Sequence, residues 1–501
     1  MSTPIPQTRT QQFARLTERP LDLLVVGGGI VGGGVARDAA MRGLRVGLVE
    51  QHDFAYGTSS RSSRLLHGGL RYLAQGHLGL VREASLEKRT LAGIAPHLAQ
   101  PLGFLFPAYR GEGPPLWQLR IGVKIYDLLC SGRNFQPSRA FSLPETRALL
   151  PGLKLEALTG SVRYFDALTN DARLVLDTLR SAAHHGAAVL NYTRLGGVRR
   201  QGDLWHCQLE DRVAGATATV QARVIVNATG PWSDRMPHSA VRLRLTKGIH
   251  LVVDQRHLPV PSAVVITEGK RILFVLPWGD RVIVGTTDTD YEGAPEDAVV
   301  EPADVDYVLR TVNRFFPRAF LVATDIISSW AGLRPLVANP DGSPSDISRE
   351  HEITSPEPGW WDITGGKLTT YRLMAEQTVD RVARELGRAK VKCLTATEPL
   401  LSADAAAYSR VIPGPCTEEA VRHYVEREWA LHLTDVMVRR SSWHYYHGDA
   451  GRQAEQVAAW MARIAGWTPA RCADELARYR AAASEGSAVG SPPAGSSRAS
   501  A

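Results

Sequence analysis

Three glycines and one glutamate near the start of the chain have the types and spacing that bind a dinucleotide. Gly27, Gly29 and Gly32 form a GxGxxG pattern, and Glu50 follows eighteen residues after the last glycine. Gly27 permits a tight turn, Gly29 lets a pyrophosphate approach the main chain, and Gly32 lets the next helix pack closely. Glu50 can accept both hydroxyls of an adenosine ribose and would repel a 2′-phosphate, which argues against NADP. The pattern predicts dinucleotide binding and leaves NAD and FAD open.

The polar loop 57–73 is the second group of residues suited to chemistry. It reads GTSSRSSRLLHGGLRYL and combines serine and threonine hydroxyls with three arginines and one histidine. Hydroxyl and guanidinium groups donate to anionic oxygens, and an arginine can bond two such oxygens at once. The loop therefore predicts contacts to phosphate or to another anion.

The elements that must position the glycines form a βαβ unit. The apolar run 21–26 predicts a strand, apolar residues at helical spacing over 31–40 predict a helix, and 45–49 predicts a second strand. A further buried strand, 222–227, leads into Gly230 more than 190 residues after the glycine turn. Such a returning strand is expected beside the dinucleotide in large FAD proteins, so it favours FAD over NAD.

Other segments predict a covering sheet and surface helices. Between 240 and 330, short strands alternate with turns, which predicts an antiparallel sheet suited to cover a substrate. Residues 115–130 have apolar side chains at helical spacing, with Arg120 and Lys124 between them. This segment is interpreted either as an ordinary helix packed on the protein body or as an amphipathic helix that meets lipid. Helices are also expected over 418–430, 452–464 and 472–483.

The composition is that of a globular enzyme with several domains. The chain has 501 residues, 44% of them hydrophobic and 22% charged, so roughly three domains are expected. Its five cysteines lack CxxC spacing, and neither a metal site nor a disulfide framework is expected. No apolar run is long enough to span a membrane, and residues 1–20 lack the apolar core of a signal peptide. The net charge of +7 favours anionic partners, but the basic residues are dispersed, so nucleic acid is not an expected partner.

Further motifs follow the glycine turn in a fixed order. They are HGGLRYL (67–73), VNATGPW (226–232), LTKGIH (245–250), VGTTDT (284–289), GLRPL (332–336) and GGKLTTYR (365–372). With these motifs the chain resembles the FAD-dependent glycerol-3-phosphate dehydrogenases, the quinone-linked respiratory type within the glycine oxidase and D-amino-acid oxidase superfamily. The resemblance implies oxidation of sn-glycerol 3-phosphate to dihydroxyacetone phosphate, with electrons passed to a membrane quinone. It thins after residue 390, where the C-terminal domain looks shorter than in well-known members.

The resemblance also implies the fold class and the domains. The expected fold is α/β, with a discontinuous Rossmann-like FAD-binding domain, an antiparallel-sheet substrate (cap) domain and a C-terminal helical domain. The expected bounds are 20–90, 160–236 and 331–385 for the FAD-binding domain, 91–159 and 237–330 for the cap domain, 386–484 for the C-terminal domain, and 485–501 for a tail that is disordered by composition.

Substrate-binding residues follow from the same motifs. Arg71 and Tyr72 of HGGLRYL, Arg334 of GLRPL and Arg349 of DISRE resemble the anion-binding positions of the family. Arginine suits a phosphate dianion because its planar fork stays charged and bonds two oxygens. His250 is also expected at the substrate.

The residues expected to take part in the chemistry are His250, His67, Lys367 and Arg334. His250 is the first choice for the base, because imidazole titrates near neutral pH and the position resembles the active-site histidine of the family. His67 is the competitor, or lies against the flavin instead. Lys367, at a glycine turn, would stabilise negative charge on the reduced ring.

The residues expected to hold FAD come from three distant parts of the chain. Thr58, Ser59 and Ser63 are expected to donate hydroxyls, or else only to cap local turns. The full set is Gly27, Gly28, Gly29, Ile30, Gly32, Glu50, Thr58, Ser59, Ser63, His67, Gly68, Gly69, Gly230, Gly366, Lys367, Leu368 and Thr369.

Several alternatives stay open at this stage. The same scaffold would serve an oxygen-using glycerol-3-phosphate oxidase, an FAD-dependent 2-hydroxyacid or amino acid oxidoreductase, or a flavin-binding scaffold without turnover. The expected partners are sn-glycerol 3-phosphate, a membrane quinone and an anionic membrane surface, and a homodimer is an open alternative for the assembly. The expected location is the cytoplasm, with peripheral attachment to the inner face of the cytoplasmic membrane.

Overall fold

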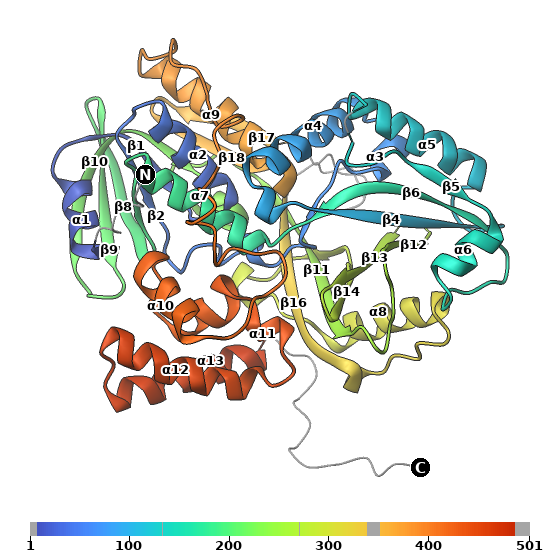
Figure 1. Cartoon of the computed structure of the whole chain (residues 1–501). Coiled ribbons are helices and arrows are strands. Elements are labelled where there is room, and N and C mark those ends of the chain that lie inside the picture. Colours follow the sequence, from blue (N-terminus) through green and yellow to red (C-terminus); the bar gives the residue numbers. More distant parts are fainter. Residues whose placement is uncertain (1–7, 133, 270, 338–350, 486–501) are drawn as a thin grey trace.

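The protein is built from two β-sheets and a group of C-terminal helices (Figure 1). The computed structural model describes residues 8–132, 134–269, 271–337 and 351–485. Sheet A has eight strands and sheet B has ten. In Figure 1 sheet A lies on the left, sheet B on the right, and the C-terminal helices lie below.

Sheet A has a parallel core made of strands that are apolar along their length. Its first strand reads LDLLVV, and only Asp22 departs from a continuous apolar run. Strands of this kind are expected where both faces of a parallel sheet are covered. The order is β17-β18-β10-β1-β2-β7, and β9 and β8 continue from β10. The strands are β1 (Leu21–Val26), β2 (Val46–Val49), β7 (Ala188–Leu190), β8 (Thr193–Gln201), β9 (Leu204–Asp211), β10 (Thr217–Asn227), β17 (His351–Glu357) and β18 (Trp360–Gly365).

Three helices share one hydrophobic core with sheet A: α2 (Ile30–Met41), α7 (Asp171–His184) and α9 (Tyr371–Glu385). The start of α2 lies so close to the preceding turn that a Cβ on Gly32 would be 1.9 Å from the carbonyl oxygen of Gly27. No residue with a side chain fits there without a backbone shift. The βαβ unit and the close packing predicted from these glycines are confirmed.

Sheet B is mostly antiparallel, as predicted for residues 240–330. Its order is β15-β11-β14-β13-β12-β4-β6-β3, with β16 paired to β11 and β5 to β6. One core packs between this sheet and α8 (Pro302–Phe315), and another between it and α5 (Leu116–Leu129). The strands are β3 (Leu65–Leu66), β4 (Gln100–Tyr109), β5 (Arg139–Phe141), β6 (Leu158–Leu168), β11 (Leu243–Asp254), β12 (Ala263–Glu268), β13 (Arg271–Trp278), β14 (Arg281–Gly285), β15 (Thr289–Tyr291) and β16 (Ile326–Val337).

Two of the expected domain bounds fall inside strands of sheet B. Residue 160 lies within β6, which pairs with β4, and residue 331 lies within β16, which pairs with β11. Because both strands pair within sheet B, these segments are part of that sheet. The motif GLRPL, expected in the FAD-binding domain, lies on β16 of sheet B and lines the larger cavity from there.

The C-terminal residues form a helical unit with its own hydrophobic core. The helices predicted over 418–430, 452–464 and 472–483 are confirmed as α10, α12 and α13, while the tail from residue 486 lies outside the described residues. No helix in the described part of the chain is long and apolar enough to cross a membrane. The remaining helices are α1 (Arg9–Thr17), α3 (Arg71–Ala74), α4 (Leu78–Ile94), α6 (Leu143–Leu149), α10 (Glu418–Arg427), α11 (Trp443–Tyr446), α12 (Ala450–Ala465) and α13 (Pro469–Glu485).

Candidate active site

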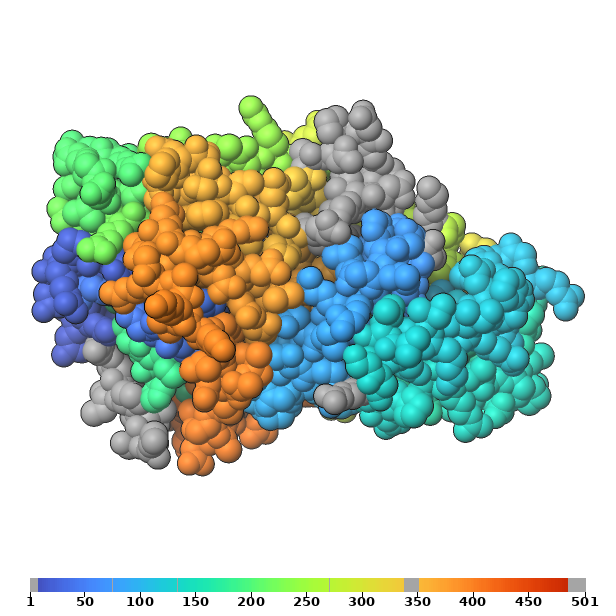
Figure 2. Space-filling view, turned by 90° about the horizontal axis from the view of Figure 1, so that it is seen from above, coloured from blue at the N-terminus to red at the C-terminus, as the bar shows by residue number. Residues whose placement is uncertain are grey.

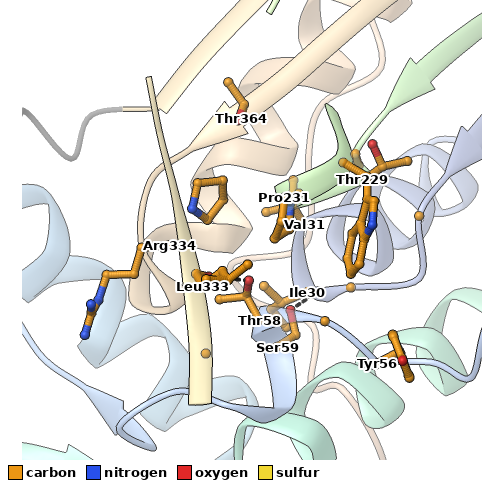
Figure 3. A pocket seen from close by; sticks show the side chains of 18 of the residues that line it. Ile30, Val31, Tyr56, Thr58, Ser59, Thr229, Pro231, Leu333, Arg334 and Thr364 are labelled. Carbon is orange, nitrogen blue, oxygen red and sulfur yellow. Dashed lines mark hydrogen bonds between the residues drawn. The ribbon is translucent and has the colours of Figure 1, made fainter. Parts of the chain in front are cut away.

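A cavity of about 640 Å³ lies between the two sheets (Figure 3). Its walls come from the glycine turn before α2, the polar loop after β2, the segment after β10, strand β16 and the glycine turn after β18. Twelve of the seventeen residues expected to hold FAD line it, whereas Gly28, Gly32, Gly68, Gly69 and Thr369 do not. The predicted FAD residues that line it are Gly27, Gly29, Ile30, Glu50, Thr58, Ser59, Ser63, His67, Gly230, Gly366, Lys367 and Leu368.

The N-terminal end of α2 is shaped for an anionic group. Gly29 is its N-cap and provides no side-chain cap, while Ile30 N–H donates to Ser59 Oγ at 3.1 Å, as Figure 3 shows. Gly27 has a φ of +112°, and a Cβ there would lie 2.5 Å from the carbonyl oxygen of Ala228. Backbone N–H groups and the positive end of the helix dipole favour a pyrophosphate at this point.

Glu50 is fixed at the end of the cavity expected to hold the adenosine. Its Oε2 accepts from Gly28 N–H at 2.8 Å and its Oε1 accepts from His52 N–H at 2.9 Å. Burial raises the pKa of Glu50, and these two backbone donors oppose the rise. Each carboxylate oxygen keeps a lone pair for a ribose hydroxyl. The glycine cradle, the helix end and this carboxylate therefore fit FAD.

The opposite end of the cavity is formed by the second glycine turn. Gly365 and Gly366 both have positive φ, +75° and +76°. Lys367 follows them, and its Nζ lies 4.0 Å from the centre of the Tyr72 ring, a cation–π contact. Thr369 Oγ1 accepts from His67 N–H at 3.0 Å. The motifs GGKLTTYR and HGGLRYL, about 300 residues apart, therefore meet here.

His250 lies on β11, buried to 2% exposure, and lines the larger cavity. Its Nε2 is 2.8 Å from Ser63 Oγ, its ring stacks on Trp330 with centroids 5.2 Å apart, and its Nδ1 has no hydrogen-bond partner among the described residues. Burial, and then the positive charges of Arg334 and Arg64, lower the pKa of His250 to about 3. The imidazole is therefore neutral at physiological pH in the unliganded protein.

A second cavity of about 500 Å³ adjoins the first. Ser63, Leu65, His67 and Arg334 line both cavities. The predicted substrate residues Arg71, Tyr72 and Arg334 meet in it together with Gly69. Arg349 lies within residues 338–350, outside the described residues.

Arg334 is held at the junction of the cavities by polar groups of sheet B. It donates to Thr286 Oγ1 at 2.9 Å and to Asp288 Oδ1 at 3.2 Å. In Figure 3 its side chain extends from β16 away from Ile30 and Thr229. An arginine held in this way is pre-organised to bind an anion in the second cavity.

A buried network behind HGGLRYL was missed by the sequence analysis. Lys88 Nζ and Tyr126 OH both donate to Asp166 Oδ1, at 2.8 and 2.5 Å, and Gly68 N–H donates to Tyr126 OH at 2.8 Å. Burial, and then the charge of Asp166, raise the pKa of Tyr126 well above its usual value. The signal that could have revealed this network is the carboxylate in the apolar strand Tyr164-Phe-Asp-Ala167, because a buried charge needs a partner.

The chain is similar to curated proteins along nearly its whole length. It is 36% identical to glycerol-3-phosphate dehydrogenase 2 of Mycobacterium bovis, over 95% of this chain and 90% of that protein. It is 38% identical to the aerobic glycerol-3-phosphate dehydrogenase of Staphylococcus aureus, over 73% of this chain and 67% of that protein. The crystal structure of glycerol-3-phosphate dehydrogenase from Bacillus halodurans, complexed with FAD, superposes with a TM-score of 0.77 at 29% identity, covering 95% of this chain and 97% of that one.

Two families match adjoining parts of the chain. The C-terminal domain of alpha-glycerophosphate oxidase matches residues 373–472, which includes helices α10 and α12. The family of FAD dependent oxidoreductases (DAO) matches residues 22–381, which includes both sheets and both cavities. FAD is accordingly the cofactor, and the residues of the larger cavity fit it. The chain belongs to the FAD-dependent oxidoreductase family.

Proposed function

We propose that this protein oxidises sn-glycerol 3-phosphate to dihydroxyacetone phosphate. The observation that carries the proposal is the meeting of Arg71, Arg334 and His67 in a cavity that adjoins the FAD cavity. Bound FAD supplies the acceptor for the hydride of the secondary alcohol. Relatives named glycerol-3-phosphate dehydrogenase that cover most of the chain support the same substrate.

The phosphate is bound by the arginines of the second cavity. Arg71 reaches this cavity from α3, which follows strand β3, and Arg334 reaches it from strand β16; Tyr72 lies beside them. Two guanidinium groups match a phosphate dianion better than the single carboxylate of a simple amino acid. This cation pair favours a phosphorylated alcohol over the alternative substrates of the scaffold.

The alcohol proton passes to His250 through Ser63. His250 lines only the FAD cavity, whereas Ser63, at hydrogen-bond distance from its Nε2, lines both cavities. Burial is the main cause of the lowered pKa of His250, and the charge of Arg334 lowers it further. A phosphate dianion beside Arg334 offsets this second contribution, and so makes the imidazole a stronger base when substrate is bound. Lys367, beside the glycine turn, stabilises negative charge that develops on the flavin side.

We propose a membrane quinone as the electron acceptor and an anionic membrane surface as the docking partner. Helix α5 buries Leu119, Val123 and Tyr126, while its outer face exposes Trp117, Ile121 and Leu128 to 63%, 53% and 74%. Arg120 and Lys124 lie exposed among them. Apolar side chains interleaved with cations suit the headgroup region of an anionic membrane. Figure 2 shows α4 and α5, in blue and cyan, together on one outer face.

We propose peripheral attachment at the inner face of the cytoplasmic membrane, and the exposed face of α5 supports the attachment. The second candidate acceptor is molecular oxygen, because residues 373–472 match the C-terminal domain of alpha-glycerophosphate oxidase. The two acceptors give different products. A quinone is reduced to quinol, whereas oxygen is reduced to hydrogen peroxide.

The test is anaerobic addition of sn-glycerol 3-phosphate to the purified holoenzyme. Loss of flavin absorbance at about 450 nm is expected, and an unchanged spectrum would contradict the substrate. Ser63→Ala and His250→Ala are each expected to slow this bleaching about a hundredfold if the pair moves the proton. Bleaching as fast as in the wild type would rule out the pair. Reoxidation by ubiquinone-1 with little peroxide formed in air supports the quinone, and the reverse supports oxygen.

A further inference from the structure

The primary hydroxyl on C1 of sn-glycerol 3-phosphate needs a hydrogen-bond partner in the active site. In the proposed function, the arginines of the second cavity bind the phosphate on C3, and Ser63 with His250 takes the proton of the secondary hydroxyl on C2. A hydroxyl that leaves water without a new partner costs binding free energy. Recognition of C1 therefore requires a further polar group in the second cavity.

Among the described residues, three carboxylates line the second cavity, those of Asp166, Asp288 and Asp290. Both oxygens of Asp290 accept from Arg244, each at 2.7 Å, and Asp288 Oδ1 accepts from Arg334 at 3.2 Å. Asp166 differs, because all of its hydrogen bonds reach one oxygen, Oδ1. No group in the described part of the chain donates to Asp166 Oδ2, so this oxygen is open to a donor on a ligand.

The carboxylate of Asp166 is buried and held in one orientation. Its exposure is 2%, and Lys88 Nζ and Tyr126 OH donate to Oδ1 at 2.8 and 2.5 Å. Lys88 is itself fully buried, and it also donates to the backbone oxygen of Phe165 at 2.9 Å. The ammonium group compensates the negative charge of the carboxylate. Because Oδ2 is already fixed in place, a hydrogen bond to it costs little conformational entropy.

Asp166 also lies beside a residue that joins the two cavities. Strand β3 pairs with β6 so that Leu66 is opposite Ala167. One residue further along this register, His67 is opposite Asp166. The Cβ atoms of opposite residues are about 5 Å apart, and their side chains lie on one face of the sheet. Because His67 lines both cavities, the carboxylate lies near the place where the substrate meets the FAD cavity.

We propose that Asp166 is a specificity-determining residue whose Oδ2 accepts a hydrogen bond from the C1 hydroxyl of the substrate. This inference rests on the proposed function. The arginines then bind one end of a three-carbon chain and the carboxylate binds the other. An alcohol phosphate without the C1 hydroxyl leaves Asp166 Oδ2 without a partner, so it is a poorer substrate. Such a compound is 1,2-propanediol 1-phosphate of matching configuration, which has a methyl group at this carbon.

The test is the ratio of kcat/KM for sn-glycerol 3-phosphate to kcat/KM for this analogue, measured on the holoenzyme with a dye acceptor. The wild type is expected to favour sn-glycerol 3-phosphate by about tenfold to a hundredfold, because the analogue loses a hydrogen bond to a charged acceptor. Asp166→Asn keeps an oxygen for Lys88 and Tyr126 and places an NH₂ group where Oδ2 was. It is expected to lower the ratio about threefold to tenfold. General damage to the fold lowers both kcat/KM values and leaves their ratio unchanged.

Two variants are matched controls. Asp290→Asn changes a carboxylate in the same cavity whose two oxygens are already bound by Arg244, and its ratio is expected to stay within about twofold of the wild type. Tyr126→Phe removes a donor to Asp166 Oδ1 and leaves Oδ2 in place, so it is expected to slow both substrates and keep the ratio. If Asp166→Asn does not fold, the double variant Asp166→Asn, Lys88→Met removes the unpaired ammonium group and gives the same ratio test. Thermal melting and the flavin spectrum report whether each variant is folded and loaded.

Failure of this inference and failure of the proposed function give different results. If sn-glycerol 3-phosphate bleaches the wild-type flavin but the two compounds have equal kcat/KM, Asp166 does not select the C1 hydroxyl. The same conclusion follows if the folded Asp166 variant keeps the wild-type ratio, or if Asp290→Asn lowers the ratio as much as Asp166→Asn does. If sn-glycerol 3-phosphate does not bleach the wild-type flavin, the substrate proposal fails and this inference fails with it.

Discussion

Arg440, in the C-terminal helical unit, donates hydrogen bonds to both carboxylate oxygens of Asp53, three residues after Glu50. Arg439 donates to the same carboxylate, and Asn191 donates to it from the end of sheet A. Burial alone would raise the pKa of Asp53, but the charges of Arg440 and Arg439 hold it well below its usual value. The C-terminal unit therefore fixes the loop that carries the carboxylate expected to bind the adenosine.

Replacing Arg440 is expected to weaken FAD binding and the fold together. In Arg440→Met, the fully buried carboxylate of Asp53 loses one of the two guanidinium groups that pair with it. The free energy of unfolding is expected to fall by about 3 kcal/mol. The melting temperature and the Kd for FAD, measured by flavin fluorescence, check this. Arg452→Met, which removes an arginine that is 82% exposed, is the control. The double variant Asp53→Asn, Arg440→Met is expected to be less damaged than Arg440→Met; equal damage would mean that the unpaired charge is not the cause.

Acid is expected to destabilise the protein below pH 6.5 through its buried histidines. Burial lowers the pKa of His250 to about 3 and of His444 to about 4, against 6.5 for each in an exposed chain. Between these values the unfolded chain binds protons that the folded protein does not. The contribution of these two histidines to the free energy of unfolding is thus fully present above pH 6.5. It is lost as the pH falls toward 3, by up to about 1.4 kcal/mol per pH unit for each histidine.

The measurement is the melting temperature from pH 7 to pH 4. His250→Gln, which cannot be protonated in this range, is expected to show a smaller loss between these pH values than the wild type. His206→Gln is the control, because His206 is on the β9 strand, away from both cavities. The same loss in His250→Gln as in the wild type would contradict a neutral buried imidazole.

Arg71→Lys is expected to raise the KM for sn-glycerol 3-phosphate about tenfold. Lysine keeps the charge but loses the fork that bonds two phosphate oxygens, and a hydrogen bond to a charged group is worth about 1.5–3 kcal/mol. Steady-state kinetics with a dye acceptor measure the change. Arg82→Lys, at an exposed position on α4, is the control. An unchanged KM would place the phosphate elsewhere.

Ile121→Glu and Leu128→Glu are each expected to reduce binding to anionic vesicles. Each replaces an exposed apolar side chain of α5 with a carboxylate. The variant buries less apolar surface in the membrane, and the anionic headgroups repel the new carboxylate. Co-sedimentation with phosphatidylglycerol vesicles is the measurement, and phosphatidylcholine vesicles test the contribution of charge. Phe320→Glu changes a similarly exposed ring outside α5. Sedimentation of all three variants to the same extent would exclude α5 as the docking helix.

The parts of the site that were predicted from the sequence are those encoded in short patterns. The glycine turn that begins at Gly27 lines the larger cavity. HGGLRYL brings His67, Arg71 and Tyr72 to the cavities, and GGKLTTYR brings Gly366, Lys367 and Leu368, whereas Gly68 and Thr369 line neither cavity. Each motif constrains the backbone of a few consecutive residues, so its local geometry can be predicted before the fold is known.

Contacts between distant polar residues could not be read in this way. Asp53 and Arg440 are 387 residues apart, and Lys88 and Asp166 are 78 apart. Asp53, Arg440 and Lys88 look like surface charges in their own segments, and only the packed structure removes them from water, whereas Asp166 lies in an apolar run that signals burial. The placement of β6 and β16 in sheet B was missed for a related reason, because strand partners are chosen by pairing across the whole sheet.

The larger cavity takes walls from both sheets, with Gly27 and Glu50 on one side and Leu333 and Arg334 of β16 on the other. A ligand that fills it contacts residues of both sheets at once. Its binding free energy adds to the stability of the folded state and is lost from both halves at once when it dissociates. The loaded protein is therefore expected to melt at a higher temperature than the apoprotein, because one ligand stabilises the walls from both sheets.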